Sequence, residues 1–246
     1  MGPIAPHIGT LNEKPLHAAL RAWVSEEGDL FEVPVCGFVA DILRGPMVVE
    51  IQTQGASRLR TKLSRLLVSH PVRLVIPVAV QTVVVTIDAE GRSRRERVSP
   101  HRGTVIDVFR DLVGLRDVLA DPNLSLDVVL IRQKEIRQAG ASRGRPTHSV
   151  CERHLLEIVD CTSFSTPADY LAVLPAELAE PFTTADLAAA LGRPRWLAQK
   201  VAYVLRGIGA LLLVGKEGRA LLYRRTRPAD GAGGVAPARV HSSHGR

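Results

Sequence analysis

The chain has 246 residues, of which 46% are hydrophobic, so it can form one large domain or two small ones with a well-packed core. Lys and Arg number 32 against 25 Asp and Glu, and the net charge of +7 suits a polyanionic partner such as nucleic acid; a basic protein without such a partner is the alternative. The three cysteines form no CxxC pair, which is typical of a reducing cytoplasm without a disulfide framework. The N-terminus resembles no signal peptide, and polar residues interrupt the longest apolar stretch, at 72–87. We therefore expect a cytoplasmic protein without a membrane span.

A helix and three short strands are predicted for the first part of the chain. The helix occupies Leu11–Val24, where apolar residues recur at helical spacing. The three strands, separated by turns at 36–37 and 44–46, are Phe31–Val35, Phe38–Leu43 and Met47–Thr53. Because side chains alternate between the two faces of a strand, pairing of the second and third strands brings Asp41 and Glu50 side by side, with Gln52 two residues further on.

The two carboxylates lie inside otherwise apolar strands, where they are costly to bury without partners. A hard divalent cation such as Mg²⁺ is a natural partner, because it prefers carboxylate oxygens and keeps water molecules for chemistry. The alternative is that Asp41 and Glu50 face solvent on a half-exposed hairpin.

A second helix, Ala56–Val68, and a long apolar strand, Val72–Val80, follow the hairpin. On the helix, Arg58, Lys62 and Arg65 form a basic stripe opposite the leucines. This stripe predicts phosphate contacts beside the carboxylates, and an ordinary solvated helix face is the alternative.

The order helix, three strands, helix, strand resembles the αβββαβ core of the PD-(D/E)xK nuclease superfamily, which has the restriction-endonuclease-like α/β fold. The resemblance covers about the first 80 residues and implies a catalytic site formed by Glu13, Asp41 and the run Glu50-Ile51-Gln52. In that reading Asp41 and Glu50 bind Mg²⁺ (or Mn²⁺), and Glu13 completes the shell. The chain departs from the family at Gln52, where a Lys is usual, and Gln can neither carry charge nor take a proton. Lys62 on the next helix is a candidate source of the missing charge.

The remainder of a domain at 1–135 contains a basic segment, a helix and a strand. The segment Arg92–Arg102, with Arg94 and Arg95 at its centre, predicts a hairpin arm that grips a DNA backbone, or else a solvated loop. The apolar residues of Thr104–Leu119 recur as on an amphipathic helix, and Leu124–Arg132 reads as a strand that completes the sheet.

Residues 136–150 are rich in Gly, Ser and Arg and predict a basic linker. His148, Cys151, His154 and Cys161 follow, but their spacing does not converge on a metal, so no zinc site is expected. We interpret Cys151–Asp160 as a helix that opens a second domain at 151–226.

The second domain resembles a winged helix-turn-helix domain. Thr183 and Asp186 form a capping-box-like helix start, a second helix is predicted at Arg195–Ile208, and a β-hairpin follows. The resemblance implies that the second helix contacts DNA, although winged helices also bind proteins. The expected DNA contacts on this helix and the wing are Arg195, Gln199, Tyr203, Arg206 and Arg219. Residues 227–246 predict a disordered tail.

These features together predict a metal-dependent endodeoxyribonuclease that hydrolyses DNA phosphodiester bonds, with the winged helix aiding DNA binding. The alternative is a DNA-binding regulatory protein whose nuclease-like domain is catalytically inactive, with Gln52 as the trace of that loss. A third hypothesis is a nuclease subunit that needs a protein partner, as in defence or repair systems. The family resemblance also raises the expectation of a homodimer.

Overall fold

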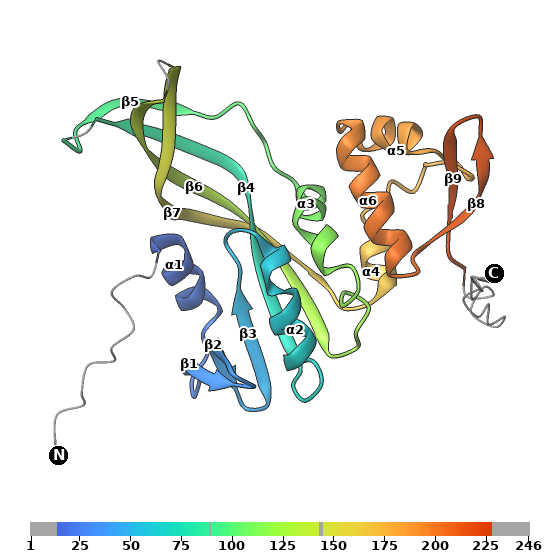
Figure 1. The fold of residues 1–246 in the computed structure, drawn as a ribbon, viewed down its shortest axis with the longest axis horizontal. Helices are drawn as coiled ribbons and strands as arrows, with labels where there is room; N and C mark the ends of the chain where they lie inside the picture. Colours follow the sequence, from blue (N-terminus) through green and yellow to red (C-terminus); the bar gives the residue numbers. More distant parts are fainter. Residues whose placement is uncertain (1–13, 89, 143–144, 228–246) are drawn as a thin grey trace, which may run out of the picture.

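A mixed sheet of seven strands forms the centre of the molecule (Figure 1). The computed structural model describes residues 14–88, 90–142 and 145–227. The first elements, in chain order, are α1 (Pro15–Val24), β1 (Leu30–Val35), β2 (Phe38–Arg44), β3 (Met47–Ile51), the 3₁₀ turn η2 (Ala56–Leu59), α2 (Arg60–Leu66) and β4 (Val72–Ile87). The predicted order of helix, three strands, helix and strand is therefore confirmed.

The sheet combines antiparallel and parallel pairs. Its order is β1-β2-β3-β4-β6-β7, where β6 is Leu124–Ser142 and β7 is Arg145–Phe164. The pairs β1–β2, β2–β3 and β6–β7 are antiparallel, whereas β4 is parallel to both β3 and β6. The far end of β4 also pairs with β5 (Ser93–Val98), so the basic segment predicted at 92–102 does begin as the second strand of a hairpin.

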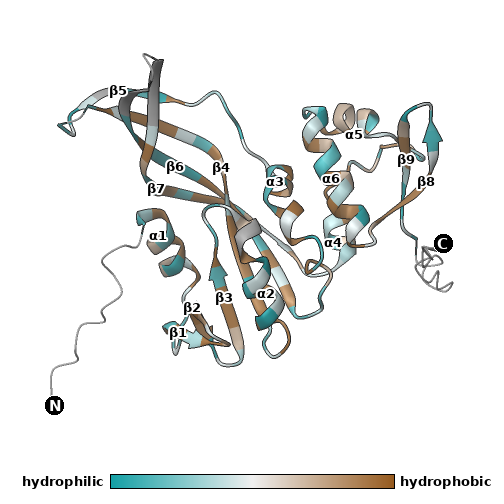
Figure 2. Cartoon of the chain, viewed as in Figure 1, coloured by the Kyte–Doolittle hydropathy of each residue, from teal (hydrophilic) through white to brown (hydrophobic). Residues whose placement is uncertain are grey.

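Helices cover both faces of this sheet, because its central strands are apolar on both sides. Leu16, Leu20 and Val24 of α1 pack on one face, against a cluster that includes Ile42 and Val129. The opposite face carries α2 and the segment around α3 (Phe109–Leu112), and it forms the larger core cluster. Figure 2 shows β3 as mostly hydrophobic and β5 as mostly hydrophilic, in agreement with this division into core and surface.

The long strands β4, β6 and β7 extend beyond the region covered by helices, and with β5 they form what we call the arm, residues 80–88, 90–98, 132–142 and 145–157 (Figure 1). Two predictions fail here. Residues 136–150 are not a linker, since their described part lies in β6 and β7, and Cys151–Asp160 is strand, not helix. The predicted domain boundary at 136–150 therefore falls inside the sheet.

Bulges in β7 explain why its sequence has helical spacing. The pairing with β6 passes over Cys151, Leu156 and Val159, and each skipped residue shifts the alternation of faces by one. Leu155 and Ile158, three residues apart, both pack against the α1 cluster as a result. The inward face expected of a helix, Leu155, Leu156 and Val159, is therefore wrong in part, since the skipped residues Leu156 and Val159 are 54% and 44% exposed.

The helix predicted at Thr104–Leu119 is a chain of short turns. It consists of η3 (Val105–Val108), α3 and η4 (Val113–Leu115). The predicted apolar face is correct, because Val108, Phe109, Leu112 and Leu115 are all buried. Its sequence contains Val105, Ile106, Val108 and Val113 and is interrupted by Gly114, and β-branched residues and glycine have weak helix propensity, which disfavours one regular helix.

The C-terminal part has the predicted order of helix, turn, helix and hairpin. Its elements are α4 (Pro167–Leu171), α5 (Thr184–Leu191), α6 (Arg195–Gly207), β8 (Leu211–Glu217) and β9 (Ala220–Arg225). The capping box at Thr183 and Asp186 is confirmed: the Thr183 hydroxyl accepts from the Asp186 amide at 3.3 Å, and the Asp186 carboxylate accepts from the Thr183 amide at 2.8 Å. Most of the tail predicted at 227–246 lies outside the described residues.

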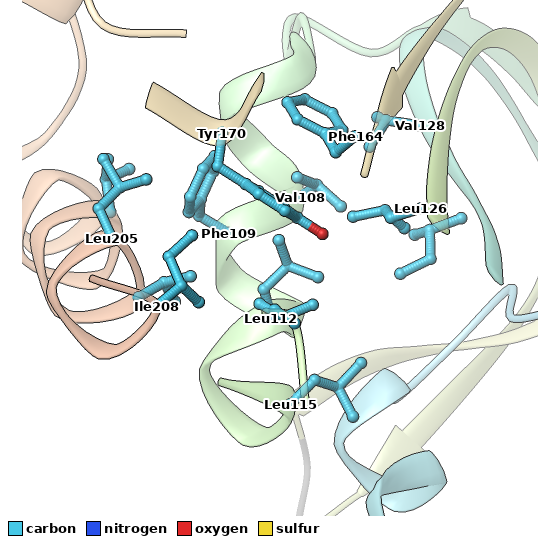
Figure 3. Packing of buried hydrophobic residues seen from close by; sticks show 14 of the residues in the cluster. Val108, Phe109, Leu112, Leu115, Leu126, Val128, Phe164, Tyr170, Leu205 and Ile208 are labelled. Carbon is cyan, nitrogen blue, oxygen red and sulfur yellow. The ribbon is translucent and has the colours of Figure 1, made fainter. Parts of the chain in front are cut away.

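The C-terminal helices and the sheet share one core. Tyr170 of α4 stacks on Phe164 at the end of β7, with ring centroids 4.8 Å apart. Figure 3 shows Leu205 and Ile208 on one side of Phe109, and Leu126 of the sheet on the other side of the cluster. A salt bridge between Arg193 and the buried Asp107, at 3.2 Å, adds a polar contact to the same junction. The two parts are therefore packed together through buried side chains, with no linker between them.

Candidate functional site

Asp41 and Glu50 lie where the β2–β3 ladder opens. The last cross-strand pair of the ladder, away from its turn, is Ile42 with Val49. The next position along the same register would pair Asp41 with Glu50. The backbone of the neighbouring strand is irregular at the same level, because Glu32 has a φ of 54° and drops out of the β1–β2 ladder. Such left-handed backbone is uncommon for a residue other than glycine and tends to occur near functional sites.

The carboxylate of Asp41 accepts a backbone hydrogen bond from β3 that a strand carbonyl would otherwise accept. Its Oδ2 atom accepts the backbone N–H of Ile51 at 2.8 Å and lies 3.3 Å from Nε2 of His17 on α1. Burial by itself would raise the pKa of Asp41, but the hydrogen bonds from His17 and from the Ile51 amide lower the pKa below its ordinary value. Asp41 is therefore held ionised at neutral pH.

Glu50 is almost fully buried, with 3% of its surface exposed. Its Oε2 atom accepts the ammonium group of Lys62 at 2.5 Å, and Lys62 also donates to the carbonyl of Val39 at 2.6 Å. Burial, together with the negative charge of Asp41, raises the pKa of Glu50 to about 7 even though Lys62 opposes the shift.

Each of the two carboxylates has one oxygen that accepts no hydrogen bond from the described residues. Within the described part of the chain, Oε1 of Glu50 is buried without a hydrogen-bond partner, and Oδ1 of Asp41 has no recorded bond. The unpaired buried oxygen of Glu50 costs free energy, and a bound cation would relieve both this cost and the repulsion between the two carboxylates. Carboxylate oxygens are the donors that a hard divalent cation prefers, so Asp41 and Glu50 are the residues that could hold one.

Two carboxylates are fewer than a complete set of protein ligands. No cluster of three or more His, Cys, Asp or Glu side chains suited to a metal occurs within residues 14–88, 90–142 and 145–227. Glu13, the third expected member of the site, lies outside those residues.

The structure places Gln52 and Lys62 differently from the sequence interpretation. The Gln52 side chain donates to the backbone carbonyl of Gln54 in its own loop. Lys62 does not join an outer basic stripe: its side chain turns toward the sheet and is 15% exposed. Of the other two stripe residues, Arg65 is exposed and lies over the Phe38 ring at 5.8 Å, and nothing is described of the Arg58 side chain.

Sequence reasoning missed His17. It follows Glu13 by four residues, a spacing that puts two side chains on the same face of a helix, so the signal was present in the sequence. His17 holds Asp41 from α1 and Lys62 holds Glu50 from α2, so helices on opposite faces of the sheet each position one carboxylate.

A separate set of predicted residues gathers in the C-terminal part. One pocket between α6 and the β8–β9 hairpin is lined by all five expected contacts: Arg195, Gln199, Tyr203, Arg206 and Arg219. Tyr203 is held by Arg116, whose guanidinium lies 4.7 Å from the centre of its ring. In the arm, Arg95 of β5 is exposed, and the Arg94 side chain is not described.

The comparisons with known proteins assign the family. Residues 14–165 match the family described as a domain of unknown function (DUF8091), and the chain belongs to it. A Treponema pallidum (strain Nichols) protein described as uncharacterized is 32% identical over 230 residues, which cover 91% of this chain and 89% of the relative. Residues 1–165 are about 67% of the chain (165 of 246), so this similarity extends into the C-terminal part. No solved structure gives a significant match.

Among the helices formed by the described residues, none has the length and apolar character needed to cross a membrane.

Proposed function

We propose that this protein is a metal-dependent nuclease that hydrolyses phosphodiester bonds in DNA. The observation that carries the proposal is the proximity of Asp41 and Glu50, each with one oxygen that accepts no hydrogen bond from the described residues, beside the ammonium group of Lys62. The element order and the mixed sheet, with helices on both faces, support the resemblance to the restriction-endonuclease-like core. Lys62 supplies from α2 the positive charge that Gln52 lacks.

In this proposal each side chain has a defined role. Asp41 and Glu50 hold the cation, which when bound lowers the pKa of a water and polarises the phosphate. His17 and the Ile51 amide keep Asp41 ionised and oriented. Lys62 holds Glu50 in place and adds positive charge where negative charge develops on the reacting phosphate.

The C-terminal part would aid DNA binding. Its order of helix, turn, helix and hairpin resembles a winged helix, and its α6–hairpin pocket gathers Arg195, Arg206 and Arg219 with Gln199. Arginines suit phosphate oxygens, and Arg and Gln can also read base edges. A pocket used for a protein partner, in a homodimer or a larger defence or repair assembly, is the alternative for this surface.

The test is cleavage of labelled duplex, single-stranded and four-way-junction DNA with Mg²⁺, Mn²⁺ or EDTA. We expect metal-dependent cleavage that falls by about a hundredfold or more in Asp41→Asn, Glu50→Gln and Lys62→Met, since each removes charge from the reacting centre. Glu177→Gln is the matched control, because it removes an exposed carboxylate far along the chain. Circular dichroism must show that every variant is folded.

A regulatory DNA-binding protein with an inactive nuclease-like domain is the second candidate. The observation in its favour is that the Gln52 side chain donates to the Gln54 carbonyl in its own loop and, among the described residues, makes no hydrogen bond to either carboxylate. DNA binding that is unchanged by EDTA and by Asp41→Asn, without cleavage of any substrate, would favour this candidate and contradict the nuclease proposal.

A further inference from the structure

A second polar pocket, of about 490 Å³, lies between the arm and α3. It begins at Thr53 and Gln54, in the loop that follows Gln52, and its lining continues over Thr82 of β4 to Glu135, Arg137 and Arg153. Neither Asp41 nor Glu50 lines it, so the pocket adjoins the carboxylate site as a separate feature. Ser99 and His101, from the segment 92–102 that was expected to grip DNA, also line it, whereas Arg94 and Arg95 do not.

Glu135 organises two arginines in this pocket. The side chain of Glu135 is 6% exposed, and its two oxygens accept Nε of Arg137 at 2.5 Å and Nε of Arg153 at 2.8 Å. Burial would raise the pKa of Glu135, but the hydrogen bonds from Arg153 and Arg137 lower the pKa below its ordinary value. The carboxylate is therefore ionised, and it holds one guanidinium from β6 and one from β7.

The arginines bring more charge than Glu135 can neutralise. One carboxylate balances one guanidinium, so the three side chains together carry a charge of +1. Each arginine donates its hydrogen bond to Glu135 through Nε, and its terminal amino groups make no hydrogen bond within the chain's described part. The side chains of Arg137 and Arg153 are 33% and 24% exposed, and both line the pocket.

We propose that Arg137 and Arg153 bind the phosphodiester backbone of a nucleic-acid strand that continues toward the carboxylate site. Guanidinium groups match the geometry of phosphate oxygens, and arginines already oriented by a buried carboxylate lose little side-chain entropy on binding. Arg110 and Asp111 of α3 line the same pocket, so this pair of side chains adds no net charge to that of the Glu135 cluster. This inference rests on the proposed function for its choice of ligand, since it takes the polyanion to be the nuclease's substrate.

The experiment measures binding of the full chain to a labelled oligonucleotide, single-stranded or duplex, by fluorescence anisotropy in EDTA over a salt series. Arg137→Gln/Arg153→Gln should weaken binding about tenfold or more and lower the salt slope for a single strand by about 1.4, or about 0.7 for each lost phosphate contact. Arg132→Gln is the matched control: Arg132 is on β6, pairs with Glu157 at 2.7 Å and does not line the pocket. It should bind nearly as tightly as the unmodified protein.

Glu135→Gln tests the positioning role. It adds net positive charge, so attraction by charge alone would tighten binding, whereas loss of the anchored arginines should weaken it. Tighter binding would overturn positioning by Glu135. Affinity in the double arginine variant equal to that of Arg132→Gln would overturn the proposed contact altogether. Displacement of the oligonucleotide by a mononucleotide at equal phosphate concentration would identify a small phosphorylated ligand and overturn strand binding.

The binding measurement does not depend on catalysis. Oligonucleotide binding that depends on Arg137 and Arg153, without cleavage under any metal, would contradict the nuclease proposal and leave this inference intact. Cleavage that depends on Asp41, together with cleavage and binding that are both unchanged in the double arginine variant, would support the nuclease proposal and overturn this inference.

Discussion

Lys62→Met removes the ammonium group from Glu50 while keeping most of the apolar length of the side chain. Glu50 is buried, and its pKa of about 7 lies above the ordinary value of 4.5 although Lys62 is present. Without Lys62 the pKa must rise further, because the two largest causes, burial and the charge of Asp41, both favour the protonated form, and only the smaller hydrogen bond with the Asp41 backbone opposes them. The variant should therefore depend more strongly on pH than the unmodified protein.

The size of the effect follows from linkage. Because folding raises the pKa of Glu50, its proton stabilises the folded state below about pH 4.5, and this stability is lost as the pH rises through about 7. In the variant the loss continues above pH 7 at about 1.4 kcal/mol per pH unit. We expect Lys62→Met to cost about 1 kcal/mol near pH 5, mainly for the lost hydrogen bonds, and about 2–3 kcal/mol near pH 8, where the buried carboxylate has lost its counter-charge.

Urea denaturation followed by circular dichroism at the two pH values measures both costs. The same substitution in a Glu50→Gln background is the control, because the pH-dependent part of the cost should vanish when the carboxylate is absent. Arg65→Met, an exposed neighbour on α2, should cost little at either pH. An equal cost of Lys62→Met at both pH values, or a pH-dependent cost that persists with Gln at position 50, would refute the reasoning.

Three other outcomes follow from the structure. If Mg²⁺ binds with a dissociation constant of about 1 mM, about 10 mM Mg²⁺ should raise the free energy of unfolding by about 1.4 kcal/mol. A thermal-shift assay measures this stabilisation. An equal stabilisation of the Asp41→Asn variant would exclude the carboxylate pair as the binding site. Tyr170→Phe should stabilise the protein to urea by about 1 kcal/mol, because its buried hydroxyl has no partner within the described residues; a destabilised variant would contradict this. Arg193→Met should cost about 1–3 kcal/mol in the same assay, since it leaves the buried Asp107 without its counter-ion; an unchanged midpoint would show that this salt bridge does not strengthen the junction.

Local patterns predicted the parts of the fold that depend on neighbouring residues. Alternation along two short strands joined by a tight turn placed Asp41 beside Glu50, and the Thr183–Asp186 spacing placed the start of α5. Each depends on fewer than about fifteen residues, within which backbone geometry leaves few options.

The arm could not be predicted in this way. Its hairpins are held by pairing between distant segments, so the Gly- and Ser-rich residues around 138–142 form strand despite their low strand propensity. The bulges at Cys151, Leu156 and Val159 then remove the two-residue period by which a strand is recognised. The Glu135 cluster is hidden for the same reason, because Arg137 and Arg153 meet only when β6 and β7 are paired in this shifted register.

The position of Lys62 weakens Gln52 as an argument for lost catalytic activity. A motif compares residue types at set distances along one strand, whereas catalysis depends on where charged atoms lie in space. The rotation of α2 is set by burial of Leu63 and Leu66, and that packing carries the Lys62 ammonium group to Glu50 from outside the strand. Since a positive charge does reach the carboxylates, Gln52 alone is no argument for lost activity. The choice between an active nuclease and an inactive DNA-binding relative therefore depends on whether Asp41 and Glu50 use their free oxygens to bind a cation, which is what the cleavage and Mg²⁺ measurements detect.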